Sequence, residues 1–373
     1  MTKLINVAFI IDSITTRSAG TEKQLLMLIN KIDRKKIKPH LVCLRSSEFL
    51  EQNEVNCDVE ILEVNSLLSL SCVKGMHRLN RIIKDEQIDV IQTYFKDGNL
   101  FGTIAGVLNR VKVLISCRRN YGSGYWHNRK WLLILKLFTR WTTMYVANSK
   151  MVESYTLVSE NVNKKQIRTI YNGLDLETFK RITPSLRNDT RRSLNVKTTD
   201  ILIGLVANWR PVKNIPLFIK VASKLNKQFN NIKFIILGKP PNAIDIAALE
   251  TNVTFIGEVT DVIPYLSAMD IGVLCSSSES LSNSITEYLA AGLPCVVSNV
   301  GGNYEAIGDG YGGLVFENNN LEEFCDKLIL LILDAGKRHQ FALNAKKIAF
   351  QRYDYLNMVK AYEDMYIELV SNR

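Results

Sequence analysis

The sequence has little of what usually holds metal ions or disulfide bonds. It contains seven cysteines but no C-x-x-C pair, and several of the cysteines lie in apolar stretches. We therefore expect reduced thiols in the core of a cytoplasmic protein. No His/Cys cluster has the spacing of a zinc site. There is also no Asp-x-Asp pair, which would gather oxygen ligands for Mg²⁺ or Mn²⁺, so the sequence predicts no metal and no resident cofactor.

Long uncharged apolar runs are missing too. The run behind Met1 ends at Asp12, and it is too short and wrongly flanked for a signal peptide. The longest other run, near 131–138, is broken by Lys136 and cannot span a bilayer. We also find no short-period repeat and no low-complexity segment. These absences predict a cytoplasmic location.

The charge balance is basic. The 373-residue chain carries a formal net charge of +10, with an isoelectric point of about 9.1, and is 46% hydrophobic. This composition is enough for two buried cores. A basic surface suits nucleic acid, an anionic membrane or an anionic substrate. The Lys and Arg residues are dispersed and form no recognition motif, so we expect no nucleic-acid partner, and a basic nucleic-acid-binding protein is the weaker alternative.

Short apolar runs alternate with helical segments along most of the chain. This alternation predicts an α/β protein whose parallel sheets are covered by helices on both faces. A charged segment with one proline, 177–199, separates two series of such units. The predicted strands are 4–11, 40–44, 59–64, 88–93, 111–116, 144–148, 167–171, 201–206, 233–238, 253–257, 271–275 and 295–298.

One stretch, 276–302, concentrates polar signals around a short helix. Ser282 and Asn283 can cap the first amides of a helix over 284–291. Gly292 is a suitable stop for that helix, and Pro294 blocks its continuation.

Two acids, Glu279 and Glu287, lie on either side of the start of this helix. The amino end of a helix offers unpaired N–H groups and a partial positive charge, which suit a phosphate. An anion site with a carboxylate on each side suggests a phosphorylated sugar as the ligand.

Two cations follow the strand predicted over 201–206. Arg210 and Lys213 leave its carboxyl end and should face the same edge of the sheet as Glu287. Arg can grip a phosphate through two donors, while Lys acts as a point charge. Two fixed cations would stabilise the negative charge that develops on a departing nucleoside diphosphate.

The spacing Glu279-x7-Glu287, the ending A-A-G-L-P-C-V and the later Gly301-Gly302-x-x-Glu305 together resemble the family 4 glycosyltransferases. The resemblance implies the GT-B fold: two facing Rossmann-like domains with an interdomain cleft and a C-terminal helix that crosses back. It implies an acceptor-side domain over 1–172 plus the helix 355–373. A nucleotide-sugar-binding domain would cover 173–354.

The resemblance also implies an activity. A sugar would move from a nucleotide diphosphate-sugar to an acceptor hydroxyl, with retention of the anomeric configuration and without a metal. The acceptor stays open among a lipid-linked saccharide, a surface polysaccharide and a small thiol precursor. The basic surface suits an anionic lipid or saccharide and favours cell-surface polysaccharide or glycolipid synthesis. A nucleotide-sugar epimerase of the same fold is the first alternative.

Roles for single residues follow from the resemblance. Glu279 would bind the donor sugar, Glu287 the ribose, and Arg210 with Lys213 the diphosphate. The amides around Ser282, Asn283 and Ser284 would complete the phosphate site. In S-A-G-T-E-K-Q-L, which resembles the family's Gly-Gly-x-Glu loop, Gly20 would approach the donor phosphates.

The chain departs from the family pattern in three places. Ala19 stands where the first glycine of that loop is usual, and Asn208 where the commonest form has its arginine. Arg118 follows the strand 111–116 where many relatives have a histidine, so it could contact donor or acceptor oxygens or pair with a carboxylate. Asp97 is a candidate acid or base, although a helix cap is the likelier role, and His127 lies in a nearby loop.

The segment 129–141, RKWLLILKLFTRW, combines cations, tryptophans and apolar residues. Such a helix could lie on an anionic bilayer as a peripheral anchor at the inner face of the plasma membrane. The alternative is a core helix whose basic ends extend to water.

Overall fold

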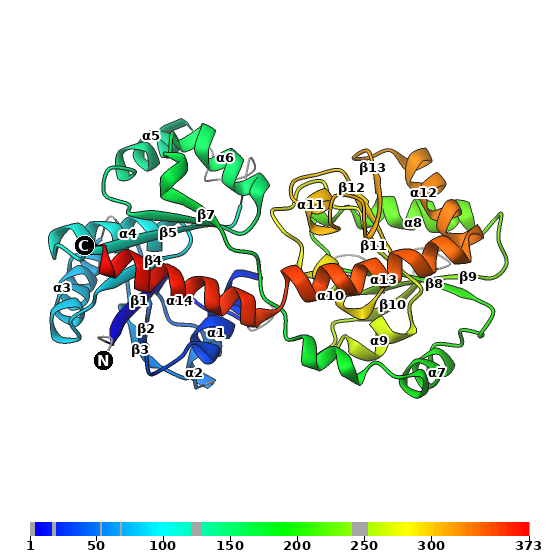
Figure 1. The fold of residues 1–373 in the computed structure, drawn as a ribbon, viewed down its shortest axis with the longest axis horizontal. Helices are drawn as coiled ribbons and strands as arrows, with labels where there is room; N and C mark the ends of the chain where they lie inside the picture. The colour runs from blue at the N-terminus through cyan, green and yellow to red at the C-terminus, as the bar shows by residue number, and fades with distance from the viewer. Residues whose placement is uncertain are drawn as a thin grey trace. The chain divides into compact units, whose positions relative to one another are not determined.

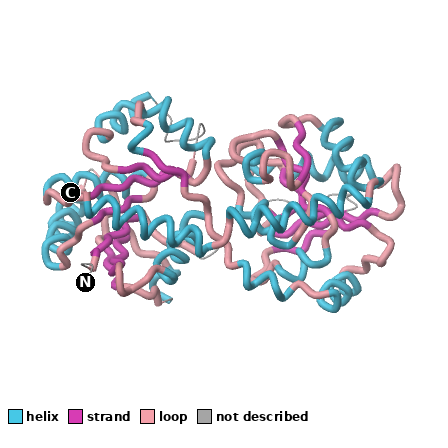
Figure 2. The backbone as a smooth tube through the Cα atoms, in the orientation of Figure 1, coloured by secondary structure: helices cyan, strands magenta, loops and turns pink. Residues whose placement is uncertain are grey.

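The computed structural model describes residues 4–16, 20–52, 54–67, 69–120, 129–240 and 253–372 (Figure 1). These residues form two compact units. The first comprises 1–173 and 355–373, and the second comprises 174–354. Each unit contains one all-parallel sheet with helices around it, as the alternation of coil, strand and helix in Figure 2 makes visible. The predicted α/β fold with two Rossmann-like sheets is confirmed.

The first unit has seven strands in the order β3-β2-β1-β4-β5-β6-β7. The strands are β1 (Ile5–Ile11), β2 (Ile37–Cys43), β3 (Asp58–Ile61), β4 (Val90–Thr93), β5 (Val113–Arg118), β6 (Met144–Ala147) and β7 (Ile167–Thr169). The helices are α1 (Gly20–Lys31), α2 (Glu48–Gln52), α3 (Leu70–Asp85), α4 (Lys96–Leu108), α5 (Arg129–Phe138), α6 (Lys150–Glu160) and α14 (Tyr355–Ser371).

Alternating residues of β1 supply the cores on both faces of this sheet. Val7, Phe9 and Ile11 pack in a cluster with α1 and α14. Ala8 and Ile10 pack in a second cluster with α3 and α4. A strand that is apolar on both faces is what a covered parallel sheet requires.

The last helix, α14, completes the first unit although it follows the second in sequence. Its Tyr362 and Tyr366 are fully buried in the cluster that contains α1, and α14 lies against β1 (Figure 1). The Tyr366 hydroxyl donates to Gln92 Oε1 of β4 at 2.7 Å. The C-terminal helix therefore returns to the first unit, as expected.

The second unit has six strands in the order β10-β9-β8-β11-β12-β13. The strands are β8 (Ile201–Val206), β9 (Ile232–Leu237), β10 (Val253–Gly257), β11 (Ile271–Leu274), β12 (Cys295–Ser298) and β13 (Gly313–Phe316). The helices are α7 (Pro184–Ser193), α8 (Ile215–Leu225), α9 (Ile263–Ala268), α10 (Asn283–Ala291), α11 (Asn303–Ala306), α12 (Leu321–Leu333) and α13 (Ala335–Arg352).

In both sheets the strand order reverses in the middle. In sequence order, the first three strands of each unit extend from the middle of the sheet to one edge. The later strands then start beside the first strand and extend to the other edge. The reversal lies between β1 and β4 in the first unit and between β8 and β11 in the second. Open parallel sheets bind ligands outside the carboxyl ends of the strands at such a point.

Within the described part of the chain, no helix combines the length and apolarity that crossing a bilayer demands. The same residues contain no group of three His, Cys, Asp or Glu side chains placed to hold a metal ion. The seven cysteines are free thiols.

Candidate functional site

The candidate site lies at the reversal point of the second unit, where two loops meet. The loop behind β8 carries Lys213 in a short 3-10 turn, and the loop behind β11 carries Glu279. The ammonium group of Lys213 forms an ion pair with the Glu279 carboxylate. Ser276 Oγ donates to the same carboxylate oxygen at 2.8 Å. The structure thus brings together two residues that the sequence analysis assigned to one site.

Backbone hydrogen bonds fix these two loops to each other. The amide of Ser277 donates to the carbonyl of Val212 at 2.8 Å. The amide of Gly302, in the turn behind β12, donates to the carbonyl of Glu279 at 3.2 Å. The Glu279 segment is therefore held on one side by the β8 loop and on the other by the Gly301-Gly302 turn.

The helix α10 begins beside this ion pair. Ser282 occupies its N-cap position, but its side chain makes no capping hydrogen bond. The helix begins at Asn283, one residue earlier than predicted, and Ser284 Oγ donates to the carbonyl of Val206 in β8 at 2.6 Å. As expected, α10 ends at Gly292, which has a φ of 74°. The hydroxyl of Ser284 thus ties the amino end of the helix to the strand that carries the cations.

Tyr288 is a positioning residue that the sequence analysis missed. Its buried hydroxyl accepts a hydrogen bond from the amide of Val206 at 2.7 Å and donates to the carbonyl of Val273 at 3.1 Å. One side chain of α10 thereby bridges β8 and β11. Room for the ring comes from Gly272, where a Cβ atom would lie 2.5 Å from it. No local pattern signals this bridge, because its partners are backbone atoms of distant strands.

Two further predicted residues lie on the elements next to the ion pair. Glu287 is 9% exposed on α10, one turn inside the helix. Arg210 precedes the 3-10 turn of Lys213 and is exposed. Among the ion pairs of the described residues none involves Arg210, so its guanidinium is open to solvent at the same strand end.

Arg118 lies in the first unit, at the end of β5, which begins and ends two residues later than predicted. Its Nε and one terminal nitrogen donate to the two carboxylate oxygens of Glu160 at 2.7 and 2.8 Å. Both side chains are largely buried, and the guanidinium also lies over the ring of Tyr145. The structure confirms that Arg118 pairs with a carboxylate, which was one of the two roles considered for it. The other role, a contact with donor or acceptor oxygens, stays a prediction.

Two acids of the first unit meet at its own reversal point. Asp97, at the start of α4, forms an ion pair with Arg45. Asp12, behind β1, accepts a hydrogen bond from the amide of Gly98 at 2.6 Å. Burial raises the pKa of Asp12 from 3.8 to about 6, against the opposing effect of the Gly98 hydrogen bond. Asp12 therefore takes the helix-capping role that the sequence analysis had favoured for Asp97.

Gly20 is the first residue of α1. Ala19 and His127 lie outside the described residues, as does the side chain of Trp131.

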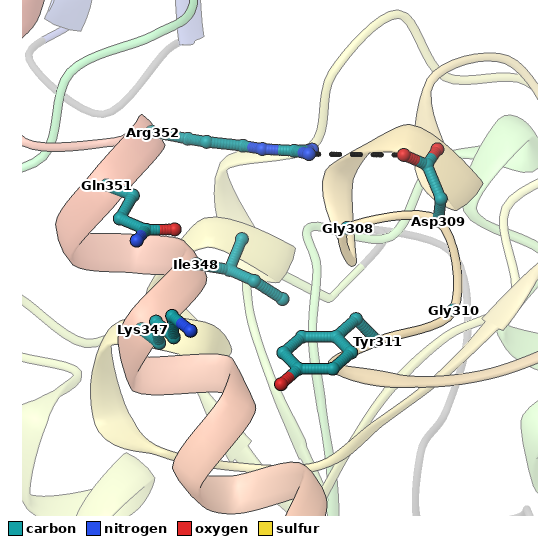
Figure 3. Close-up of a pocket in the computed structure, with 8 residues that line it drawn as sticks. All are labelled: Gly308, Asp309, Gly310, Tyr311, Lys347, Ile348, Gln351 and Arg352. Carbon is teal, nitrogen blue, oxygen red and sulfur yellow. Dashed lines mark ion pairs between the residues drawn. The ribbon is translucent and has the colours of Figure 1, made fainter.

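A separate cavity of about 480 Å³ lies in the second unit between α13 and the turn that follows α11 (Figure 3). Arg352 and Asp309 form an ion pair across one end at 3.9 Å, and Ile348 extends between the two walls. None of the residues predicted to act on a substrate lines this cavity.

Each unit matches a known protein family. Residues 18–178 match the family described as Glycosyltransferase Family 4. Residues 187–348 match the family described as Glycosyl transferases group 1.

Individual relatives match across nearly the whole chain. The chain is 23% identical over 376 residues to an Escherichia coli UDP-Gal:α-D-GlcNAc-diphosphoundecaprenol α-1,3-galactosyltransferase, covering 95% of each. It is 24% identical to a Campylobacter jejuni N,N'-diacetylbacillosaminyl-diphospho-undecaprenol α-1,3-N-acetylgalactosaminyltransferase, covering 82% of this chain and 84% of that one. Among solved structures, Anabaena HepE in complex with UDP and glucose superimposes with a TM-score of 0.80 at 21% identity. That superposition covers 97% of this chain and 99% of HepE.

The raised pKa of Asp12 predicts a pH-dependent effect of Asp12→Asn. Asparagine keeps an oxygen for the Gly98 amide but cannot ionise. Because the folded-state pKa lies above the unfolded one, the contribution of Asp12 to wild-type stability is greatest below about pH 4 and is lost as the pH rises through about 6. At pH 8 the variant should be more stable by about 2 kcal/mol, a shift of roughly two pKa units discounted for partial exposure. The advantage should disappear by about pH 4 in urea unfolding, and an advantage that is the same at both pH values would contradict the assignment.

Proposed function

The chain belongs to glycosyltransferase family 4, and from that membership we propose that it transfers a sugar from a UDP-sugar to a hydroxyl of a lipid-linked saccharide. That it is a glycosyltransferase rests on both family matches and on relatives that are transferases by name. Neither of these relatives is named as an epimerase or a nucleic-acid-binding protein. UDP is the proposed donor carrier because the E. coli relative is named for UDP-Gal.

The observation that carries the donor site is the Lys213–Glu279 ion pair at the amino end of α10. In our proposal the diphosphate lies between Lys213, Arg210 and the first amides of this helix. The helix end suits this role because the Ser282 side chain makes no capping bond there. Glu287 would accept hydrogen bonds from the ribose hydroxyls.

Donor binding would change the partner of Glu279. When the diphosphate takes the charge of Lys213, the Glu279 carboxylate is released to accept hydrogen bonds from the donor sugar. The two cations then stabilise the charge that grows on the departing UDP, and this stabilisation is larger in the transition state than in the ground state. The 12% exposure of the Glu279 side chain strengthens these interactions, since little water screens them.

We further propose retention of the anomeric configuration without a metal. In the donor complex Glu279, still held by Ser276, would accept hydrogen bonds from the sugar hydroxyls, and we assign it this binding role and not that of a covalent nucleophile. The acceptor hydroxyl would therefore attack on the face from which UDP departs, and a phosphate oxygen would take its proton. Lys213 and Arg210 would supply the positive charge that a metal provides in other transferases.

The proposed acceptor is a saccharide on a polyprenyl diphosphate, in cell-surface polysaccharide or glycolipid synthesis. Two relatives that match over most of the chain are named for sugars linked to diphosphoundecaprenol. Such an acceptor stays in the membrane, so the enzyme has to reach a bilayer surface.

An apolar stripe on the first unit supports attachment to that surface. Leu133, Leu137 and Trp141, spaced four residues apart along and just beyond α5, are 65%, 52% and 46% exposed. Lys136 and Arg140 lie exposed between them. Apolar side chains flanked by cations fit the interface of an anionic membrane, so we propose peripheral binding at the inner face of the plasma membrane.

A transfer assay tests the activity itself. The full-length protein is incubated with UDP-galactose, UDP-GlcNAc or UDP-GalNAc and a diphosphate-linked GlcNAc lipid, with and without EDTA. We expect acceptor-dependent release of UDP that survives EDTA and gives an α-linked product by NMR. A β-linked product would rule out retention, and activity lost in EDTA and restored by Mn²⁺ would rule out metal independence. Conversion of the donor into another UDP-sugar without acceptor would indicate an epimerase.

Lys213→Ala tests the diphosphate site. Loss of a charge that acts in the transition state should lower kcat by about 100-fold or more, while the thermal unfolding midpoint changes little. Lys224→Ala is the matched control, because Lys224 pairs with Glu322 elsewhere on the same unit. Near-normal turnover of the Lys213 variant would refute the assigned role.

The membrane surface is tested by co-sedimentation with vesicles of phosphatidylglycerol and phosphatidylcholine. Leu133→Glu combined with Leu137→Glu should reduce the bound fraction at least several-fold, because two charges would have to enter the interface. The control pair is Leu333→Glu with Leu343→Glu, which alters two exposed leucines of the second unit. Equal binding by both double variants would exclude this stripe as the membrane contact.

A further inference from the structure

Arg119, next to Arg118, is a partly buried cation that has no carboxylate partner among the described residues. One terminal nitrogen donates to Asn172 Oδ1 at 2.8 Å, and the other donates to the hydroxyl of Tyr362 at 3.4 Å. Its Nε is buried and has no hydrogen-bond partner. In the part of the chain that the structure describes, no acid pairs with Arg119. A guanidinium carries more N–H donors than these two bonds use.

The neighbouring arginine shows how the fold neutralises a cation at this position. Arg118 has both oxygens of Glu160 and a further bond to Ser116 Oγ. Its charge is neutralised where it is buried, whereas the charge of Arg119 is not. Withdrawing an uncompensated charge from water is costly, so a cation of this kind that lines a cavity is a candidate for binding a ligand of opposite charge.

The groups around Arg119 are neutral. Its guanidinium lies 5.7 Å from the centre of the Tyr94 ring. Burial raises the pKa of the Cys117 thiol to about 11, and burial raises the pKa of Tyr362 as well. Neither group therefore supplies a negative charge at neutral pH. The positive charge of Arg119 is therefore available to a ligand that binds next to it.

Arg119 also lines a cavity at the carboxyl ends of β4 and β5. The walls include Thr21, Tyr94, Phe95 and Asn120. Thr21 is in the first turn of α1, whose amino end adds a partial positive charge. The one acid in the lining, Glu160, is already neutralised by Arg118. The cavity therefore presents a cation, a helix end and polar donors, and it offers no free anion.

We propose that Arg119 binds the diphosphate of the lipid-linked acceptor, and this assignment rests on the proposed function. A planar guanidinium can engage two phosphate oxygens at once, which distinguishes it from lysine. The aromatic wall of Tyr94 and Phe95 keeps water away from this contact and strengthens it. Arg119 is in this view a specificity residue: it selects acceptors that carry phosphate next to the accepting sugar.

The test measures binding of a short acceptor analogue after the donor site has been filled. The full-length protein is saturated with UDP and titrated by calorimetry with farnesyl diphosphate, with farnesol and pyrophosphate as separate arms. Arg119→Gln should weaken farnesyl diphosphate binding by about 10-fold or more, which corresponds to about 1.4 kcal/mol. Arg119→Lys keeps the positive charge but not the planar two-donor geometry, so its affinity for farnesyl diphosphate should lie between those of the wild type and Arg119→Gln. Farnesol should bind weakly to every variant.

Arg168→Gln is the matched control, because Arg168 pairs with Glu368 on the exposed surface of the same unit. It should bind farnesyl diphosphate like the wild type. If Arg119 were only structural, its glutamine variant would lower the thermal midpoint and leave the affinity unchanged, which would overturn the proposal. UDP binding by the same variants distinguishes failure of this inference from failure of the proposed function. If the variants bind UDP and Arg119→Gln does not weaken farnesyl diphosphate binding, this inference alone is refuted. If the wild type does not bind UDP, the proposed function is refuted.

Discussion

The pairing of β8 with β11 is the constraint on which the donor site depends. The two strands run parallel, with Ile271 opposite Ile203 and Val273 opposite Leu205. Their carboxyl ends consequently meet at one edge of the sheet, although Lys213 and Glu279 are 66 residues apart in the chain. Any other neighbour for β8 would separate the lysine from the carboxylate and from the start of α10.

Several weaker interactions turn this meeting into a fixed geometry. Tyr288 joins α10 to both strands, and Ser284 joins its first turn to β8. The Ser277 amide joins the two loops. The bonds of Tyr288 and Ser284 reach backbone atoms near the carboxyl ends of β8 and β11, so the start of α10 is held by the sheet and not by the flexible parts of long side chains. A site held in this way loses little entropy when it closes on a charged ligand.

The sequence was sufficient where the signal is local. The end of α10 was predicted because Gly292 permits a left-handed φ and Pro294 prevents further helix. The strands were predictable because a covered parallel sheet demands continuous apolar runs. Arg118 shows the limit: its partner Glu160 is 42 residues away, and no periodicity links them. Arg119 shows the same limit, because only the fold reveals that none of the described acids pairs with it. The donor-site assignments of single residues stay predictions.

The return of α14 has a consequence for how the protein is made on the ribosome. Met358, Tyr362, Met365 and Tyr366 belong to the same core as β1 and α1, yet they are synthesised after the whole second unit. The second unit is one continuous segment and can fold as soon as it has emerged. The first unit, although it emerges earlier, has to wait with part of its apolar surface uncovered until α14 arrives. Nascent chains of this architecture therefore expose an unfinished hydrophobic face late in translation, when chaperones have the most to protect.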